Sequence, residues 1–406
     1  MRHGRHLLSH LLTLSAVAVL LADNVPLLAQ SRADEIARQQ QARAETATPD
    51  LPSRVERFFE QSEQGKWFVG VPRGWYPAFG SIYPGGGFTG GVGYRHYIGY
   101  DSYVDASALY SVANYKQVKL AASTPNHLGD RLDLSGSIAW ADATQVPFYG
   151  LGIGSSQDNR TSFRVNRTQV AGIATLHLVD WLQLALNGGI DDYTQLEGQG
   201  SFPSIETVFS PETAPLLGQD LTYLRGEVSA AALWLASPSY SRRGGLARLA
   251  YEEFNPLQGG GDTFGIASLE VVQHIPVLRE TWVLSLRGRS ESVVSPSDVV
   301  PYFLMPYLGS GSTLRGYTTG RFRDRHSLLL TSEMRWFPNR LGFDMALFFD
   351  AGKVAPEFDG LTLKNMKTDV GIGARFHTPA STVLRIELAH GLEAVSYTHL
   401  TLPTKA

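Results

Sequence analysis

The sequence predicts an all-β fold, specifically a transmembrane antiparallel β-barrel of about 16 strands. Three observations support this prediction. The chain of 406 residues is rich in glycine (41) and in aromatic residues (19 Phe, 17 Tyr and 7 Trp), and only 18% of it is charged. Its side chains alternate between apolar and polar with period two over residues 67–394. Beyond the N-terminus there is no run of about 20 apolar residues, which excludes a polytopic helical membrane protein.

The composition also excludes several classes of function. The chain has no cysteine, so disulfides, thiolate metal sites and cysteine nucleophiles are absent. A net charge of −3 gives no electrostatic basis for binding nucleic acid. The histidines lack metal-ligand spacing, and the glycines at 85–87 and 150–154 do not open a helix as a phosphate loop does. We therefore expect no metal, no cofactor, no nucleic-acid partner and no enzymatic activity.

The first 29 residues are predicted to be an export signal peptide. A basic start precedes the apolar stretch 11–22, and Ala29 provides a small residue before the cleavage point. A transmembrane anchor is the alternative, but Asp23 interrupts the apolar run before it is long enough to span a bilayer. Residues 30–66 are polar and have no strand pattern, so we expect a short periplasmic segment ahead of the barrel.

The period-two alternation identifies the individual strands. Successive side chains of a strand point to opposite faces. In residues 344–351, Asp344 and Asp350 share one face, whereas Leu347 and Phe349 share the other. The same alternation recurs in residues 131–140, 282–291, 328–336, 369–377 and 384–389. Most segments therefore have one apolar face and one face that is charged or small.

A soluble β-sandwich would give the same alternation, and three features favour the membrane instead. The predicted strands are about 10–12 residues long, as a tilted membrane-spanning strand requires. Charged residues are frequent on the polar face, which a water-filled lumen tolerates. Aromatic residues lie near the expected strand ends, where membrane interfaces favour them: Trp140, Trp181, Trp234, Trp282, Trp336 and Phe337. In lipid such a sheet must close on itself to satisfy its backbone.

The connections between the fifteen candidate strands alternate in length. Residues 338–340 and 378–381 are predicted tight turns, whereas 195–220, 294–325 and 354–366 are long. Outer-membrane barrels have short periplasmic turns and long extracellular loops. The pattern therefore predicts the cell outer membrane of a Gram-negative bacterium, with the N-terminus in the periplasm.

The last twelve residues, 395–406 (VSYTHLTLPTKA), break from the strand pattern. They resemble the translation of a transposon sequencing adapter, and a genuine polar tail is the alternative. Single-chain bacterial barrels have even strand numbers, so we expect the natural protein to continue past Ala394 with a sixteenth strand. Pro403 would interrupt a strand ladder, which makes this segment a poor replacement for the missing strand.

Motifs in the last third of the barrel suggest a family. The tetrapeptide Leu314, Arg315, Gly316 and Tyr317 follows the small residues at 309–312. Glu333 lies on the next predicted strand in SEMRWFP, and Phe348 and Asp350 lie on the following one in FFDAGKV. Together these pieces resemble the BamA/TamA-like outer-membrane β-barrel family, also known as bacterial surface antigens, over residues 67–394. The stretch FYGLG at 148–152 resembles another recurring motif of these barrels.

The resemblance implies a loop that folds back into the barrel. By parity, Glu333 and Asp350 face the lumen on neighbouring strands. A guanidinium is always charged and pairs with carboxylates bidentately, so Arg315 between them would pin the loop to the wall. Gly316 would allow close approach of the backbone, and Tyr317 would pack against Phe348. A solvated loop arginine is the alternative for Arg315.

The resemblance also implies a function: protein insertion, assembly or translocation at the outer membrane. Expected partners are outer-membrane lipid, lipopolysaccharide and unfolded protein clients of a monomeric barrel. Family members that assemble outer-membrane proteins carry periplasmic polypeptide-transport-associated domains, for which residues 30–66 are too short. A passive pore or structural surface barrel is therefore the alternative, and an outer-membrane enzyme is a third, although no G-x-S-x-G motif occurs.

Overall fold

The computed structural model describes residues 72–237, 241–278, 280–295, 299–338, 342–377, 382–393 and 396–401. All of them belong to one compact unit, Gln61–Ala406. The predicted signal peptide (1–29) and polar segment (30–66) lie outside the described residues, as do most of the predicted turns at 338–340 and 378–381. No helix in the described ranges is long and apolar enough to cross a membrane.

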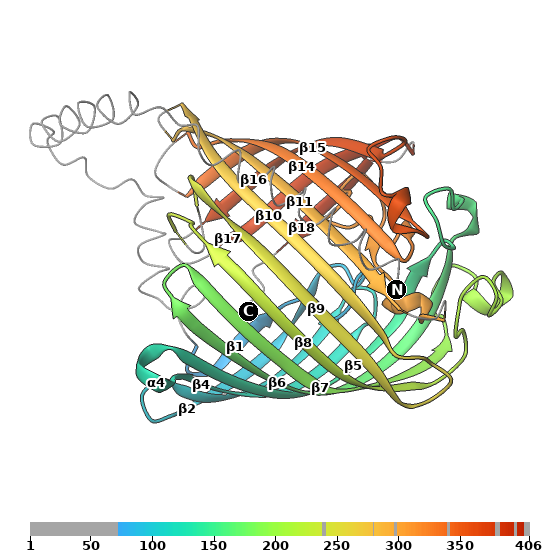
Figure 1. Cartoon of the computed structure of the whole chain (residues 1–406), viewed down its shortest axis with the longest axis horizontal. Coiled ribbons are helices and arrows are strands. Elements are labelled where there is room, and N and C mark those ends of the chain that lie inside the picture. The colour runs from blue at the N-terminus through green and yellow to red at the C-terminus, as the bar shows by residue number, and fades with distance from the viewer. Residues whose placement is uncertain are drawn as a thin grey trace, which may run out of the picture. The chain divides into compact units, whose positions relative to one another are not determined.

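Within the described residues, sixteen antiparallel strands form one sheet in which each strand pairs with its neighbours in sequence order (Figure 1). They are β1 (Gly74–Phe79), β2 (Thr89–Ile98), β3 (Ser102–Ser111), β4 (Lys116–Asn126), β5 (Leu132–Phe148), β6 (Thr161–Val179), β7 (Leu182–Glu197), β8 (Leu221–Leu233), β9 (Gly244–Gln258), β10 (Phe264–Leu278), β11 (Trp282–Val294), β14 (His326–Trp336), β15 (Phe343–Ala355), β16 (Lys367–His377), β17 (Thr382–Gly391) and β18 (Ser396–Thr401). This order confirms the predicted all-β meander.

The remaining elements are short and lie in the connections. A small two-stranded sheet pairs β12 (Tyr307–Leu308) with β13 (Phe322–Arg323). The helical turns are α4 (His127–Asp130), η1 (Gln157–Asn159), η2 (Ile205–Thr207), η3 (Tyr302–Leu304) and η4 (Phe358–Gly360). We call the end of the sheet that carries η1 to η4 the loop end, and the opposite end, where two residues join β6 to β7, the turn end.

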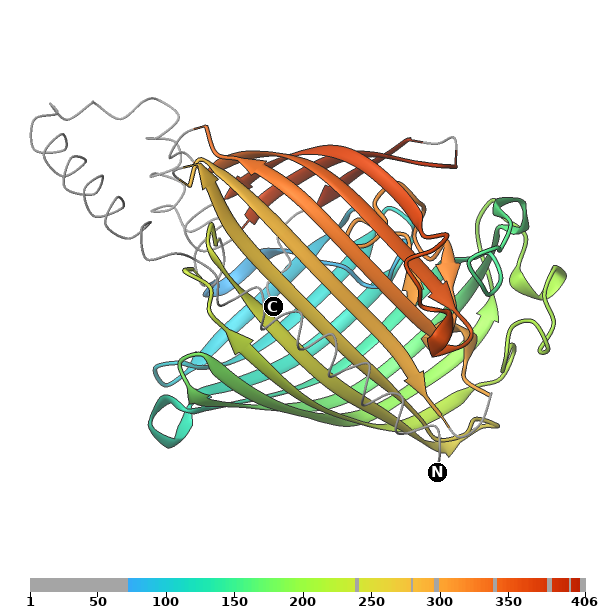
Figure 2. The same cartoon turned by 45° about the horizontal axis from the view of Figure 1, so that its top comes forward.

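The sheet curves so that β14–β17 lie across from β4–β8 (Figure 2). Exposed apolar side chains such as Ile138, Leu186 and Leu249 mark the outer face. Buried charged side chains such as Asp191 and Asp350 mark the inner face. Because directly paired residues of antiparallel strands point to the same side, the pairing registers assign every other strand residue to a face.

Several strands are longer than predicted. From β5 to β11 the strands have 13 to 19 residues rather than 10–12. Trp140, expected near a strand end, consequently lies in the middle of β5. These strands continue at the loop end, where buried residues such as Phe148 and Phe163 pack against the long connections. Trp282 and Trp336, in contrast, form a stacked pair at the turn end, with ring centroids 5.9 Å apart.

β1–β11 and β14–β17 make fifteen strands before residue 395, the number that the sequence predicted, and the sheet has a sixteenth member. Residues 396–401, within the segment predicted to be foreign, form β18 and pair with β17 over six positions. A free strand edge exposes unpaired backbone donors and acceptors and pairs with the extended chain that follows it. Within the described part of the chain β18 does not pair with β1, so the sheet is open there.

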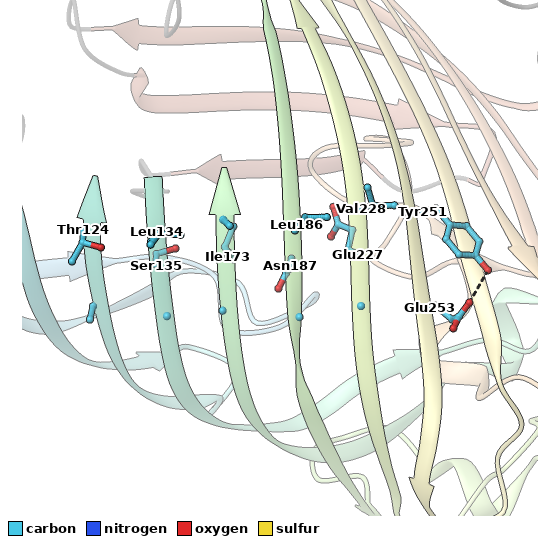
Figure 3. Close-up of a pocket in the computed structure, with 16 residues that line it drawn as sticks. Thr124, Leu134, Ser135, Ile173, Leu186, Asn187, Glu227, Val228, Tyr251 and Glu253 are labelled. Atoms are coloured by element: carbon cyan, nitrogen blue, oxygen red, sulfur yellow. Dashed lines mark hydrogen bonds between the residues drawn. The ribbon is translucent and has the colours of Figure 1, made fainter. Parts of the chain in front are cut away.

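A row of glycines crosses the outer face of β5–β8. Gly136 pairs with Gly172, Gly172 with Gly188, and Gly188 with Gly226. We call these four residues the glycine row. Because they have no side chains, a shallow trough of about 860 Å³ lies along them, flanked by residues such as Leu134, Leu186 and Val228 (Figure 3).

Candidate functional site: an arginine clamp inside the sheet

The site is built around a loop that lies against the inner face of the sheet. We call residues 309–321, between β12 and β13, the interior loop. The loop is closed at its base, where the Gly320 amide donates to the Gly309 carbonyl (2.8 Å). A turn in which the Tyr317 amide donates to the Leu314 carbonyl (3.2 Å) places Arg315 and Gly316 at its tip.

Apolar packing fixes the loop on both sides of that tip. Leu314 and Tyr317 are completely buried in a cluster with Leu308, Phe322, Leu329 and Val354. The Tyr317 ring packs against Phe322, with centroids 5.1 Å apart, rather than against Phe348 as the sequence suggested. The Tyr317 hydroxyl donates to the Thr368 carbonyl (3.1 Å) at the start of β16.

Arg315 binds carboxylates from three strands. Its Nε and Nη2 donate to the two oxygens of Asp350 on β15, at 2.7 and 2.9 Å. Its Nη1 donates to Glu333 on β14 and to Glu387 on β17, both at 3.1 Å. The guanidinium carbon lies 3.4 Å from the centroid of the Phe348 ring, a close cation–π contact.

The clamp belongs to a larger buried network of charges. Arg375 donates to both oxygens of Glu333 at 2.6 Å and to Glu387 at 2.9 Å. At its turn-end side, Arg335 and His377 both contact Asp344 at 2.7 Å. The arginines of this network are Arg315, Arg335, Arg375 and Arg385, and the carboxylates are Glu333, Asp344, Asp350, Asp369 and Glu387.

One carboxylate of the network, Asp369, forms no direct ion pair within the described ranges. Asp369 on β16 is 2% exposed and lies directly opposite Asp350 in the pairing register. Its carboxyl group interacts with the Gly316 amide at the loop tip and with the Asp350 carboxyl, and the charge of Arg315 also acts on it. Arg315 uses both of its parallel donors on Asp350, so the two carboxyl groups compete for one guanidinium.

Burial makes the network sensitive to the loss of any single member. Charges that leave water are costly unless they are paired and hydrogen-bonded. Burial alone would lower the pKa of the Arg315 guanidinium, but its hydrogen bonds to Asp350 and the surrounding carboxylates outweigh this effect and raise the pKa. Arg315 therefore remains charged, and its removal would leave several carboxylates without compensation.

Glycines on two elements make room for these contacts. A Cβ at Gly316 would lie 2.5 Å from both the Asp369 Cβ and the Gly391 amide nitrogen, so only glycine lets the loop tip reach the wall. A Cβ at Gly371 would lie 2.2 Å from the Phe348 ring, and one at Gly373 would lie 2.9 Å from the Glu387 side chain. These glycines on β16 leave the space that the ring and the carboxylate occupy.

A second apolar core fills the loop end. Phe148, Phe163, Tyr193, Phe209, Tyr302 and Phe303, which we call the aromatic core, pack with ring centroids 4.9 to 6.5 Å apart. Beside it, Arg323 is buried and donates to the carbonyls of Tyr302 (3.1 Å) and Met305 (3.2 Å). Burial lowers the pKa of this guanidinium, whereas at Arg315 the surrounding carboxylates outweigh the same effect of burial.

The structure brings together most of the residues that the sequence singled out and adds others. Arg315 contacts Glu333 and Asp350, the two partners that the resemblance implied, and Gly316 lies where the backbone approaches the wall. Arg315 also lies over Phe348, which was expected beside Tyr317 instead. Sequence reasoning missed the roles of Arg375 and Glu387, although period-two parity would have placed both on the inner face. Nothing in the sequence pattern singles out Arg321, which forms a separate contact described below.

In the described residues, no group of three or more histidine or acidic side chains is arranged to hold a metal. The site instead connects the interior loop firmly to the wall formed by β14–β17.

The Omp85 superfamily domain model matches residues 97–398. This chain belongs to the Omp85 superfamily. It is accordingly an outer-membrane β-barrel.

Two solved Omp85 structures show the same fold. BamA from Haemophilus ducreyi, crystallised without POTRA domains 1-3, aligns with a TM-score of 0.58 at 13% identity, covering 82% of this chain and 69% of that one. CdiB from Escherichia coli aligns with a TM-score of 0.50 at 13% identity, covering 82% of this chain and 62% of that one. No curated protein matches the sequence.

Proposed function

We propose that this barrel takes part in inserting, assembling or translocating proteins at the bacterial outer membrane. The observation that carries the proposal is the Arg315 clamp. It joins the interior loop to β14, β15 and β17, and these strands would therefore move together with the loop. A simple pore has no need of a buried link between a loop and three strands.

The edge of the sheet supports the same proposal. β1 has six residues and pairs on one side with β2. A strand edge presents unpaired backbone N–H and C=O groups, which an extended polypeptide can use to add a strand. In this proposal an unfolded client pairs with an edge of the sheet while the clamp keeps the neighbouring wall rigid.

A passive pore is the second candidate, and the inner face of β6–β9 favours it. Arg167, Asp191, Arg225 and Glu252 form a continuous line of ion pairs there at 2.7 to 2.9 Å. Charged walls suit a water-filled lumen. Against this candidate, the rings of the aromatic core pack closely together at the loop end and would have to separate before ions could pass.

We assign the loop end to the cell exterior and the turn end to the periplasm, because outer-membrane barrels have their long loops outside. In this orientation the N-terminal segment is periplasmic. The outer face contacts outer-membrane lipid and lipopolysaccharide, the barrel acts as a monomer, and its role requires no enzymatic step.

The proposal is tested with the full-length protein in liposomes. An unfolded client barrel protein is added, and its folding is followed by the shift in gel mobility between unheated and heated samples. Empty liposomes and liposomes containing Arg315→Ala serve as controls, and ion conductance is measured on the same preparations.

Faster client folding than in empty liposomes, reduced by Arg315→Ala, supports a role in insertion. Conductance without any acceleration of client folding would instead establish a pore and overturn the proposal.

A further inference from the structure

Arg321 makes a second buried link, six residues after Arg315 in the same loop. Its Nε and Nη2 donate to the two carboxylate oxygens of Glu393, at 2.8 and 2.6 Å. Its Nη1 and Nη2 also donate to the hydroxyl and carbonyl oxygens of Ser155, at 2.8 and 2.7 Å. The arginine side chain is only 3% exposed.

Aromatic rings hold this guanidinium in one orientation. Its central carbon lies 5.1 Å from the Tyr149 ring centroid and 4.6 Å from that of Phe322. Bidentate pairing fixes direction as well as energy, and the stacked rings limit the rotamers that Arg321 can adopt. The Arg321–Glu393 contact therefore has one fixed geometry, unlike a mobile surface ion pair.

The two partners of Arg321 come from distant parts of the sheet. Ser155 lies in the connection between β5 and β6, and Glu393 lies two residues beyond the end of β17. Further bonds connect the loop region to the same two places. Tyr149 and Thr318 hydroxyls are 2.7 Å apart, and the Gly152 amide donates to the Arg323 carbonyl at 2.8 Å. On the other side, the Leu392 amide donates to the Tyr317 hydroxyl at 3.2 Å.

We propose that Arg321 is a positioning residue that fixes the loop end of β17 relative to the β5–β6 connection. Because β18 pairs with β17, Arg321 would also hold this strand pair, which we call the final hairpin. Arg315 attaches the interior loop to the wall, whereas Arg321 attaches the end of β17 to the interior loop. The two arginines thus have separate roles: Arg315 holds the interior loop, and Arg321 holds the final hairpin. Release of the second frees the hairpin while the loop stays bound.

Hydrogen exchange of the full-length protein in lipid tests this assignment. Glu393→Gln keeps the size of the side chain and removes its charge. We expect exchange of the β17 amides near Gly391 to rise about tenfold or more, because a hydrogen bond to a charged group is worth at least that factor. The amides of residues 309–318 should remain as protected as in the wild type. Arg315→Ala should instead raise exchange in the interior loop.

Glu270→Gln is the matched control. Glu270 pairs with Arg287 on the inner face at 2.6 Å, far from β17 in the pairing order. This variant loses one ion pair of the wall and should leave β17 exchange unchanged. Unchanged β17 exchange in Glu393→Gln, or an equal rise in β17 and the interior loop, would overturn the assignment.

A double-mutant cycle separates a direct contact from independent effects. Arg321→Gln with Glu393→Gln should raise β17 exchange no further than the larger single variant, because both remove the same link. Effects that add in full would contradict the pairing.

The consequence for client folding rests on the proposed function. In the liposome assay, the client should fold more slowly with Glu393→Gln than with Glu270→Gln. The reason is that the final hairpin of Glu393→Gln is no longer held against the interior loop. If the wild type does not accelerate client folding, the proposed function fails while the exchange results still decide the role of Arg321. If it does accelerate folding and exchange is unchanged in Glu393→Gln, only the assignment of Arg321 fails.

Discussion

Two walls of this barrel place glycines on opposite faces, and the glycines serve opposite purposes. On β16, Gly371 and Gly373 face inward, and their space is taken by the Phe348 ring and the Glu387 side chain. On β5–β8 the glycine row faces outward, and the nearest atom to a Cβ at Gly136 would be 3.6 Å away. The first wall uses missing side chains to admit other groups, whereas the second leaves a trough of about 860 Å³.

The charges of the two walls differ in the same way. On β6–β9, Asp191 binds Arg167 and Arg225 from the adjacent strands, so each link joins neighbours that backbone hydrogen bonds already hold. On β14–β17, Arg315 enters from a loop and connects three strands at once. Local pairs add modestly to a wall that would form without them, whereas the clamp determines where a loop lies.

The largest expected effect therefore comes from Arg315. Arg315→Ala leaves the buried carboxylates of Glu333, Asp350 and Glu387 short of one cation, and breaking a buried pair in this way costs ~3–5 kcal/mol. The sheet should still form, because its ladders are independent of the loop. We expect loss of heat-resistant gel mobility and rapid proteolysis within residues 299–325.

Arg315→Lys sharpens this prediction. Lysine keeps the charge but cannot reproduce the planar fork that grips Asp350, so this variant should be intermediate. Arg167→Ala, which removes a partly exposed neighbour-strand pair, serves as the control from the other wall and should retain a protected loop. Wild-type behaviour of both Arg315 variants would show that the clamp contributes nothing to loop position.

The glycine substitutions should have the next largest effect. A Cβ added at Gly371 would lie 2.2 Å from the Phe348 ring and 2.5 Å from the Leu388 carbonyl oxygen. Overpacking of this kind costs ~1–3 kcal/mol, and displacement of Phe348 would also disturb the ring under Arg315. We expect Gly371→Ala to lower the midpoint of urea-induced unfolding in liposomes.

Gly226→Ala is the matched substitution in the glycine row. Nothing lies within 4 Å of its added Cβ, so stability should stay within about 0.5 kcal/mol of the wild type. An equal loss in both alanine variants would mean that strand geometry, and not the space above the glycine, decides the outcome.

Much of this architecture was predictable because a strand has a two-residue period. Parity placed Glu333 and Asp350 on the inner face, and alternation predicted fifteen strands before residue 395, the number that the described residues contain. The alternation underestimated the lengths of β5–β11. It reports which side chains face lipid or water, whereas the extra residues of these strands are buried under connections whose paths the sequence does not specify.

The least predictable contacts were those of the loops. Tyr317 was expected beside Phe348, but its ring contacts Phe322 and its hydroxyl donates to the Thr368 carbonyl. Arg321 has partners 72 and 166 residues away, neither of which belongs to a motif. A loop side chain has no periodicity from which its direction can be derived, so only three-dimensional placement reveals such a contact.

The smallest expected effect separates two carboxylates that the sequence cannot tell apart. Asp350 and Asp369 lie directly opposite each other on β15 and β16, but Arg315 binds Asp350 alone. Asp369→Asn keeps the size of the side chain and leaves the hydrogen bonds between Arg315 and Asp350 intact, so its urea midpoint should equal or slightly exceed that of the wild type. Asp350→Asn, which weakens the grip on Arg315, should lower the midpoint clearly. If the two variants lose stability equally, then Asp369 contributes to holding the loop, and the clamp has four carboxylate anchors instead of three.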